Sequence, residues 1–147
     1  MRKWTTIIWI FAAFGCNDHK VEKTTPVDTN LTSTKTCIKH IIAQDSVLGA
    51  VRNHAPETMP LSTAINQYAQ DLQGLDYTGC PSGFVMAFHA HIEAWKEVTQ
   101  VTDDYSELRG ELHTVFDSLE KSPDSVRFRK LVKGVWDTWA DVEEQMQ

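Results

Sequence analysis

The sequence predicts an all-α fold, a single up-and-down bundle of four or five helices over residues 37–147 with a flexible N-terminal tether before it. In this region apolar residues recur at spacings of three and four, which places them on one face of a helix. No useful length of chain alternates with period two, and there is no Asn-Gly or Asp-Gly hairpin turn. The chain shows no internal repeat, so we expect one domain with short antiparallel connections.

The first helix is expected over about residues 37–52, where Ile38, Ile41 and Ile42 share a face and Asp45 follows on it. It should end near Asn53–Pro56, because proline disfavours helix in the residue before it. A second helix should begin after Pro60 and stop at Gly74. Its apolar stripe consists of Leu61, Ile65, Tyr68, Ala69 and Leu72.

The third helix has the clearest pattern, with an apolar seam at steps of four and three and Ser82 as a candidate cap. The seam consists of Phe84, Phe88, His91, Trp95 and Val98. A fourth stripe almost continues it, through Val101, Tyr105, Leu108, Leu112, Val115 and Leu119. Residues 82–120 could therefore form one helix or two, and we expect a break at Thr99–Asp104, where polar and cap-type residues gather.

The last helix should open at Ser122-Pro123-Asp124, which offers a cap, a proline for the first helical position and an acid in the first turn. Its stripe runs from Phe128 to Met146 and includes Trp139. Trp136 lies on the flank of this stripe. It either covers a core edge or is exposed as a contact surface.

The N-terminus has the pattern of a removable export signal. Arg2 and Lys3 precede a short apolar run, Ile7–Phe14, which is too short to span a bilayer as a stable helix. Ala13-Phe14-Gly15-Cys16 resembles the lipobox of bacterial lipoproteins. This resemblance is limited to residues 1–16. It implies that residues 1–15 are removed, that Cys16 carries acyl chains such as palmitate, and that the protein is lipid-anchored in the cell envelope, on the periplasmic side or the cell surface.

Residues 16–36 are rich in Thr and lack aromatic residues, so we expect them to form the tether between the lipid and a domain at 37–147. The first 15 residues hold two of the 14 basic residues and none of the 20 acidic ones, which leaves a mature chain with a formal charge of −8. This negative net charge opposes binding to nucleic acid, whose phosphates are negative as well. With Cys16 lipidated, Cys37 and Cys80 should form a disulfide in an oxidising compartment.

Several histidines are candidate ligands for a metal or a haem. His89 and Glu93 share a helical face, Met86 could join them, and His113 or His40 could approach from a neighbouring helix. His91 lies on the apolar seam, as a hydrogen-bonded core histidine or as an axial haem ligand. Partners considered for it on the last helix are Asp137, Asp141 and Trp139.

The chain contains no nucleophile elbow, phosphate-binding glycine loop or zinc-protease signature. We therefore expect a non-enzymatic binding or scaffolding protein, held on a membrane by its lipid, without a cofactor and with an envelope protein as a possible partner. The alternative is a metal- or haem-binding bundle that uses His89, His91 or His113.

Overall fold

The computed structural model describes residues 29–147, with side chains from residue 33 onward. Over this range it contains helices and no strand, which confirms the all-α fold. The helices are α1 (Thr29–His54), α2 (Leu61–Gln73), α3 (Ser82–Thr102), α4 (Leu112–Leu119) and α5 (Ser125–Glu144), with 3₁₀ turns at Ala55–Glu57 and Asp103–Tyr105. The signal peptide, Cys16 and the expected tether up to residue 28 lie outside the described residues.

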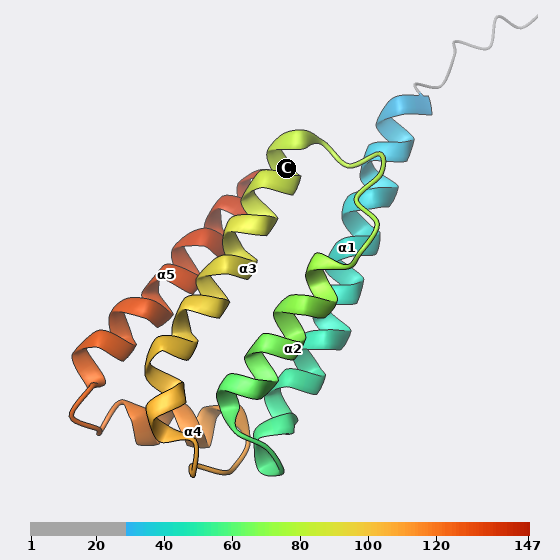
Figure 1. Cartoon of the computed structure of the whole chain (residues 1–147). Coiled ribbons are helices and arrows are strands. Elements are labelled where there is room, and N and C mark those ends of the chain that lie inside the picture. The colour runs from blue at the N-terminus through green and yellow to red at the C-terminus, as the bar shows by residue number, and fades with distance from the viewer. Residues whose placement is uncertain (1–28) are drawn as a thin grey trace, which may run out of the picture.

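The long helices α1, α2, α3 and α5 run alternately up and down the bundle (Figure 1). Helix α1 packs on α2, α2 on α3 and α3 on α5, while α4 lies at one end, where it contacts α1. The loop between α2 and α3 and the C-terminus lie at the opposite end (Figure 1). The first and last helices, α1 and α5, therefore face each other across the side of the bundle that the other pairs leave free.

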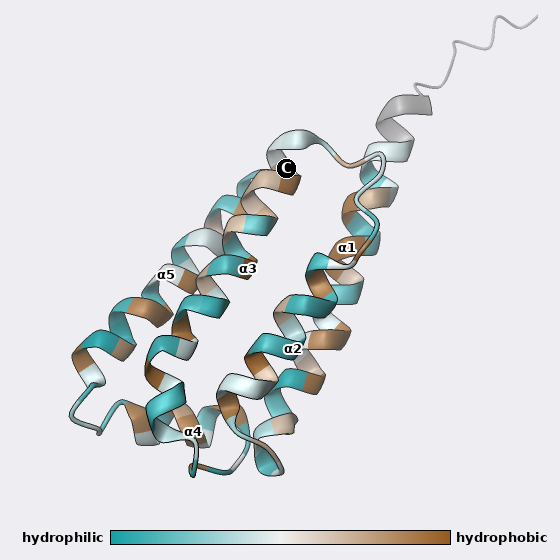
Figure 2. Cartoon of the chain, in the orientation of Figure 1, coloured by the Kyte–Doolittle hydropathy of each residue, from teal (hydrophilic) through white to brown (hydrophobic). Residues whose placement is uncertain are grey.

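The core lies along the bundle axis, where the apolar stripes of the helices meet (Figure 2). Phe84 and Phe88 of α3 stack with ring centres 5.6 Å apart, and Phe128 of α5 is fully buried beside Phe116. Fully burying a side chain of this size contributes about 1.5–3 kcal/mol. The heptad-like seam of α3 is thus the centre of the core, as the sequence pattern predicts.

Helix α1 begins at Thr29, earlier than the expected start at Cys37. The predicted disulfide between Cys37 and Cys80 is present, with the two Cα atoms 5.3 Å apart, and it joins α1 to the loop before α3. Gly79 in that loop has φ +84°, and a Cβ built on it would lie 3.3 Å from Ser33 Oγ. The loop thus lies against the early turns of α1, and this packing supports helix where Thr-rich sequence alone disfavours it.

Residues 82–120 form two helices, and α3 ends at Thr102, within the expected break. The second helix is much shorter than its stripe suggested, because Tyr105 and Leu108 lie in the connection. Gly110 has φ +144°, and its N–H donates to the Pro56 carbonyl at 3.2 Å, which ties the connection to the 3₁₀ turn that follows α1. A residue with this φ cannot continue a helix, so α4 begins only at Leu112.

The expected side-chain caps of α3 and α5 are wrong. Pro81 and Asp124 occupy the two N-cap positions, and neither makes a side-chain cap hydrogen bond. Ser122 Oγ instead accepts a hydrogen bond from the Asp124 N–H at 3.2 Å, inside the turn that precedes α5. The proline before α3 sets an extended entry into that helix, a role for which no side-chain oxygen is needed.

Candidate functional site: a cleft between the first and last helices

A cleft of about 160 Å³ opens on the side of the bundle where α1 faces α5. We call it the seam cleft. Its lining residues come from four helices: Asp45 and Arg52 of α1, Tyr68 of α2, His91 and Trp95 of α3, and Trp136 and Trp139 of α5. Its volume is comparable to the cavity of about 150 Å³ that holds one benzene molecule in an engineered protein core. It therefore has room for one small group.

Arg52 supplies the positive charge of the seam cleft. Its guanidinium carbon lies 3.8 Å from the centre of the Trp95 ring and 4.3 Å from that of Tyr68. Nη2 donates to Asn53 Oδ1 at 3.0 Å, whereas the buried Nε has no hydrogen-bond partner among the described residues. Burial lowers the pKa of Arg52, and the nearby Tyr68 and Asp45 oppose that shift. No described carboxylate lies within ion-pair distance of this guanidinium.

Asp45 supplies the negative charge and is held by α2. The Tyr68 hydroxyl donates to Asp45 Oδ1 at 2.5 Å across the α1–α2 contact. Burial, and then the charge of Asp45, raise the pKa of Tyr68, so its hydroxyl stays protonated and remains a donor. The hydrogen bond leaves Asp45 Oδ2 without a protein partner among the residues described.

His91 forms the floor of the seam cleft and has both ring nitrogens engaged. Trp95 Nε1–H donates to His91 Nε2 at 3.2 Å. His91 Nδ1 lies 3.2 Å from the Val135 carbonyl oxygen and 3.2 Å from Thr138 Oγ1. Since Nε2 accepts, the neutral ring carries its proton on Nδ1 and donates it toward α5. Burial lowers the pKa of His91, which favours this neutral form.

The interpretation of His91 as a hydrogen-bonded core histidine fits this geometry. Its partners differ from the acids and the indole considered on α5, because a backbone carbonyl and a threonine hydroxyl occupy that position. The Trp139 indole instead donates to Glu143 Oε1 at 3.0 Å, and the Trp139 ring lies 5.1 Å from that of His91.

Two tryptophans of α5 form the outer wall. Trp139 is half-buried, whereas 65% of Trp136 is exposed. The sequence left two alternatives for Trp136, a cover over a core edge or an exposed side chain. The structure shows it exposed, at the edge of the seam cleft. An exposed tryptophan next to a cleft is typical of a contact surface, because its large rigid ring supplies area at low entropic cost.

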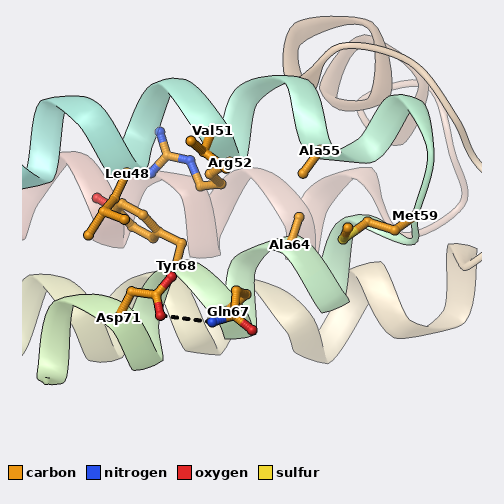
Figure 3. A pocket seen from close by; sticks show the side chains of 9 residues that line it. All are labelled: Leu48, Val51, Arg52, Ala55, Met59, Ala64, Gln67, Tyr68 and Asp71. Carbon is orange, nitrogen blue, oxygen red and sulfur yellow. Dashed lines mark hydrogen bonds between the residues drawn. The ribbon is translucent and has the colours of Figure 1, made fainter.

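A second, smaller cavity of about 80 Å³ lies on the α2 side of α1 (Figure 3). Leu48, Val51, Ala55 and Met59 give it an apolar lining, and Arg52 and Tyr68 line it as well. Arg52 and Tyr68 therefore form the wall between the two cavities. A third, more voluminous hollow of about 430 Å³ is lined mainly by apolar residues, among them Ile38, Ile42 and Met146. Of the three, the seam cleft has the mixed charges and the exposed tryptophan, so we take it as the candidate site.

The other sequence candidates lie elsewhere. Exposed His89 makes an edge contact with Tyr77, with ring centres 4.9 Å apart, while Glu93 accepts hydrogen bonds from Gln73 and Lys96. His113 is exposed on α4 beside Glu111, and Met86 is exposed on α3. Within residues 29–147 no group of three or more His, Cys, Asp or Glu side chains is arranged to hold one metal ion.

Sequence reasoning missed Arg52 as a functional residue. The available signal was its spacing from Asp45, because seven residues are almost two helical turns and put both on one face of α1. Ile38, Ile41 and Ile42 indicate that this face is apolar. The charged residues Asp45 and Arg52 on the same face therefore mark a position where polar groups approach the core.

None of the described helices is long and apolar enough to cross a membrane. Comparison with protein-family models, with curated proteins and with solved structures gives no match for this chain.

Proposed function

We propose that this chain is a lipid-anchored protein of the bacterial cell envelope that acts without catalysis, by binding, and that the seam cleft is its binding site. The observation that carries the proposal is the position of Trp136, a largely exposed indole at the edge of a cleft with a buried floor. Three neighbouring groups of different chemistry, the Arg52 cation, the Asp45 anion and the Trp139 ring, favour recognition of a specific partner over a passive spacer role.

The binding step is tested with Trp136→Ala. Since this side chain is exposed, the variant should fold like the wild type and should lose a partner that the wild type captures from detergent-solubilised envelopes. Val126→Ala is the matched control, because Val126 is 74% exposed on the same helix and does not line the seam cleft. Equal capture by wild type and Trp136→Ala would contradict the proposal.

The anchor is tested separately with Cys16→Ser. A lipid anchor predicts that this substitution moves the protein from the membrane fraction to the soluble fraction, because acyl chains hold the chain on the bilayer. Metabolic labelling with a fatty acid should mark the wild type and leave Cys16→Ser unlabelled. A wild-type protein that is unlabelled and soluble would contradict the lipid-anchored assignment and leave the binding test unaffected.

A further inference from the structure

The ligand chemistry of the seam cleft follows from three features of its lining. It has a guanidinium whose buried Nε has no partner among the described residues, a carboxylate with an unused oxygen, and indole rings beside them. The Arg52 guanidinium lies over the rings of Trp95 and Tyr68, which stand at 80° to each other, and these two contacts limit its movement. A guanidinium held in one place beside a cleft is suited to a carboxylate, because the hydrogen bond between the two charged groups is stronger than one between neutral groups.

The opposite charge of Asp45 restricts the ligand further. A simple anion in the seam cleft would meet the Asp45 carboxylate as well as Arg52, because both line it. A ligand that carries an N–H donor next to its carboxylate satisfies both residues. The indole rings of Trp136 and Trp139 then offer an apolar surface to the rest of the ligand. His91 offers no further charge, since both its ring nitrogens are engaged.

We infer that the seam cleft binds an α-carboxylate with an adjacent N–H donor and an apolar side chain, with Arg52 holding the carboxylate and Asp45 the N–H group. This is the chemistry of a free apolar amino acid and of the C-terminal residue of a peptide. The cleft of about 160 Å³ has room for the carboxylate and N–H groups of one such residue, and its apolar side chain would extend along the exposed Trp136 at the edge. The inference rests on the proposed binding function and names its ligand.

The first experiment measures binding of a matched ligand series to the purified full chain by calorimetry and tryptophan fluorescence. L-leucine carries both charges, L-leucinamide lacks the carboxylate, and 4-methylpentanoate lacks the amine. We expect L-leucine to bind at least about tenfold more tightly than either, since each loses a charge-assisted hydrogen bond. Equal affinities for the three ligands would overturn the inference, because neither charge would then matter. Absence of binding at millimolar concentration would overturn it too if N-acetyl-L-leucine also fails to bind.

A second pair of ligands distinguishes a free amino acid from the end of a peptide. N-acetyl-L-leucine represents a peptide C-terminus, and its C-terminal amide lacks the carboxylate. Tighter binding of L-leucine than of N-acetyl-L-leucine identifies a free amino acid. Tighter binding of N-acetyl-L-leucine, with loss of binding in its amide, identifies a peptide C-terminus. Each result supports the shared chemistry, and an amide that binds as well as the free acid argues against it.

The variants test which residue meets which group. Arg52→Gln should abolish the preference for L-leucine over L-leucinamide, and Asp45→Asn should abolish the preference for L-leucine over 4-methylpentanoate. Because each readout is a ratio of affinities for one protein, partial unfolding of a variant leaves it unchanged. Arg129→Gln, at an exposed position of α5, should keep both preferences. Preferences that survive in Arg52→Gln and Asp45→Asn would overturn the assignment.

The two proposals fail separately. If no ligand binds while Trp136→Ala still loses its captured partner, the ligand assignment is wrong and the binding function stands. If L-leucine or N-acetyl-L-leucine binds with the predicted preferences while partner capture is the same in wild type and Trp136→Ala, the ligand assignment stands and the proposed partner surface is wrong.

Discussion

The guanidinium carbon of Arg52 lies 3.8 Å from the centre of the Trp95 ring. The same guanidinium lies 4.3 Å from the centre of Tyr68, whose ring meets Trp95 edge-on at 5.9 Å. One cation from α1 thus contacts rings from α2 and α3, and three helices meet at a single charged side chain. Any change of the Arg52 charge should therefore be detected in the stability of the whole bundle.

Replacement of Arg52 by Met keeps an unbranched stem and removes the charge. We expect the free energy of unfolding to fall by about 1 kcal/mol, because two cation–π contacts at a partly desolvated position are lost. Urea unfolding followed by tryptophan fluorescence measures the change. Arg129→Met should leave the midpoint unchanged, since Arg129 is exposed. A midpoint for Arg52→Met equal to that of the wild type would show that these contacts add no stability.

His91 should make stability depend on pH. Its pKa is lower in the folded chain because of burial; the Asp45 charge and the Val135 carbonyl act in the opposite direction, and the Arg52 charge adds a smaller lowering. The unfolded chain therefore takes up a proton more readily, below its ordinary pKa of about 6.5, so the free energy of unfolding falls as the pH drops through that value.

The measurement compares the pH dependence of urea unfolding for wild type and His91→Gln between about pH 5 and pH 7.5, the range around the ordinary histidine pKa. The wild type should lose stability toward the acid end more steeply than His91→Gln. Exposed His54, whose pKa is raised by Glu57, is present in both proteins and cancels in the comparison. Parallel profiles for wild type and His91→Gln would show that His91 titrates normally.

The disulfide between Cys37 and Cys80 closes a sequence separation of 43 residues. Its loss should lower the free energy of unfolding by up to about 4 kcal/mol, because the unfolded chain gains the entropy of an open loop. Thermal unfolding with and without a reducing agent measures this. The Cys37→Ser/Cys80→Ser variant should resemble the reduced wild type and should not respond to the reductant. Two alkylatable thiols in the native protein would contradict the assignment.

The buried hydroxyl of Thr102 should lower the free energy of unfolding. Thr102 is 1% exposed, and its Oγ1 has no hydrogen-bond partner in the described part of the chain. Thr102→Val replaces that oxygen by a methyl of similar shape and should raise the free energy of unfolding by about 1 kcal/mol. Thr99→Val is the control, because Thr99 Oγ1 donates to the Lys96 carbonyl at 2.7 Å. Loss of this hydrogen bond should not raise the free energy of unfolding. Equal effects at the two positions would refute the explanation.

Two glycines should respond in opposite directions to alanine. Gly110 has φ +144°, and a Cβ there would lie 3.1 Å from Thr114 Cγ2, so Gly110→Ala should destabilise by at least about 1 kcal/mol. Gly134 lies inside α5 with nothing within 4 Å of a built Cβ, so Gly134→Ala should stabilise by about 0.5–1 kcal/mol. Melting temperatures of both variants test this, and a stabilised Gly110→Ala would show that the connection before α4 tolerates another backbone conformation.

Most of the fold could be predicted because apolar spacing is a local property. The stripe Phe84–Phe88–His91–Trp95 predicts the face of α3 that lies in the core, and Leu61 and Gly74 mark the bounds of α2 closely. The start of α1 and the shortness of α4 depend on contacts between distant segments. Ser33 lies beside Gly79, and the Gly110 N–H bonds to the Pro56 carbonyl. No local pattern encodes such pairs.

The amino-acid order by itself determined the helical class, the long helices, the pairing of Cys37 with Cys80 and the polar anomaly at His91, because each depends on periodicity or on counting. Only the tertiary structure decided the site. Arg52 and Trp136 are 84 positions apart, and they line one cleft because α1 and α5 face each other when the bundle closes. Which side chains gather there depends on how the helices are rotated against one another, and that is set by packing of the whole core.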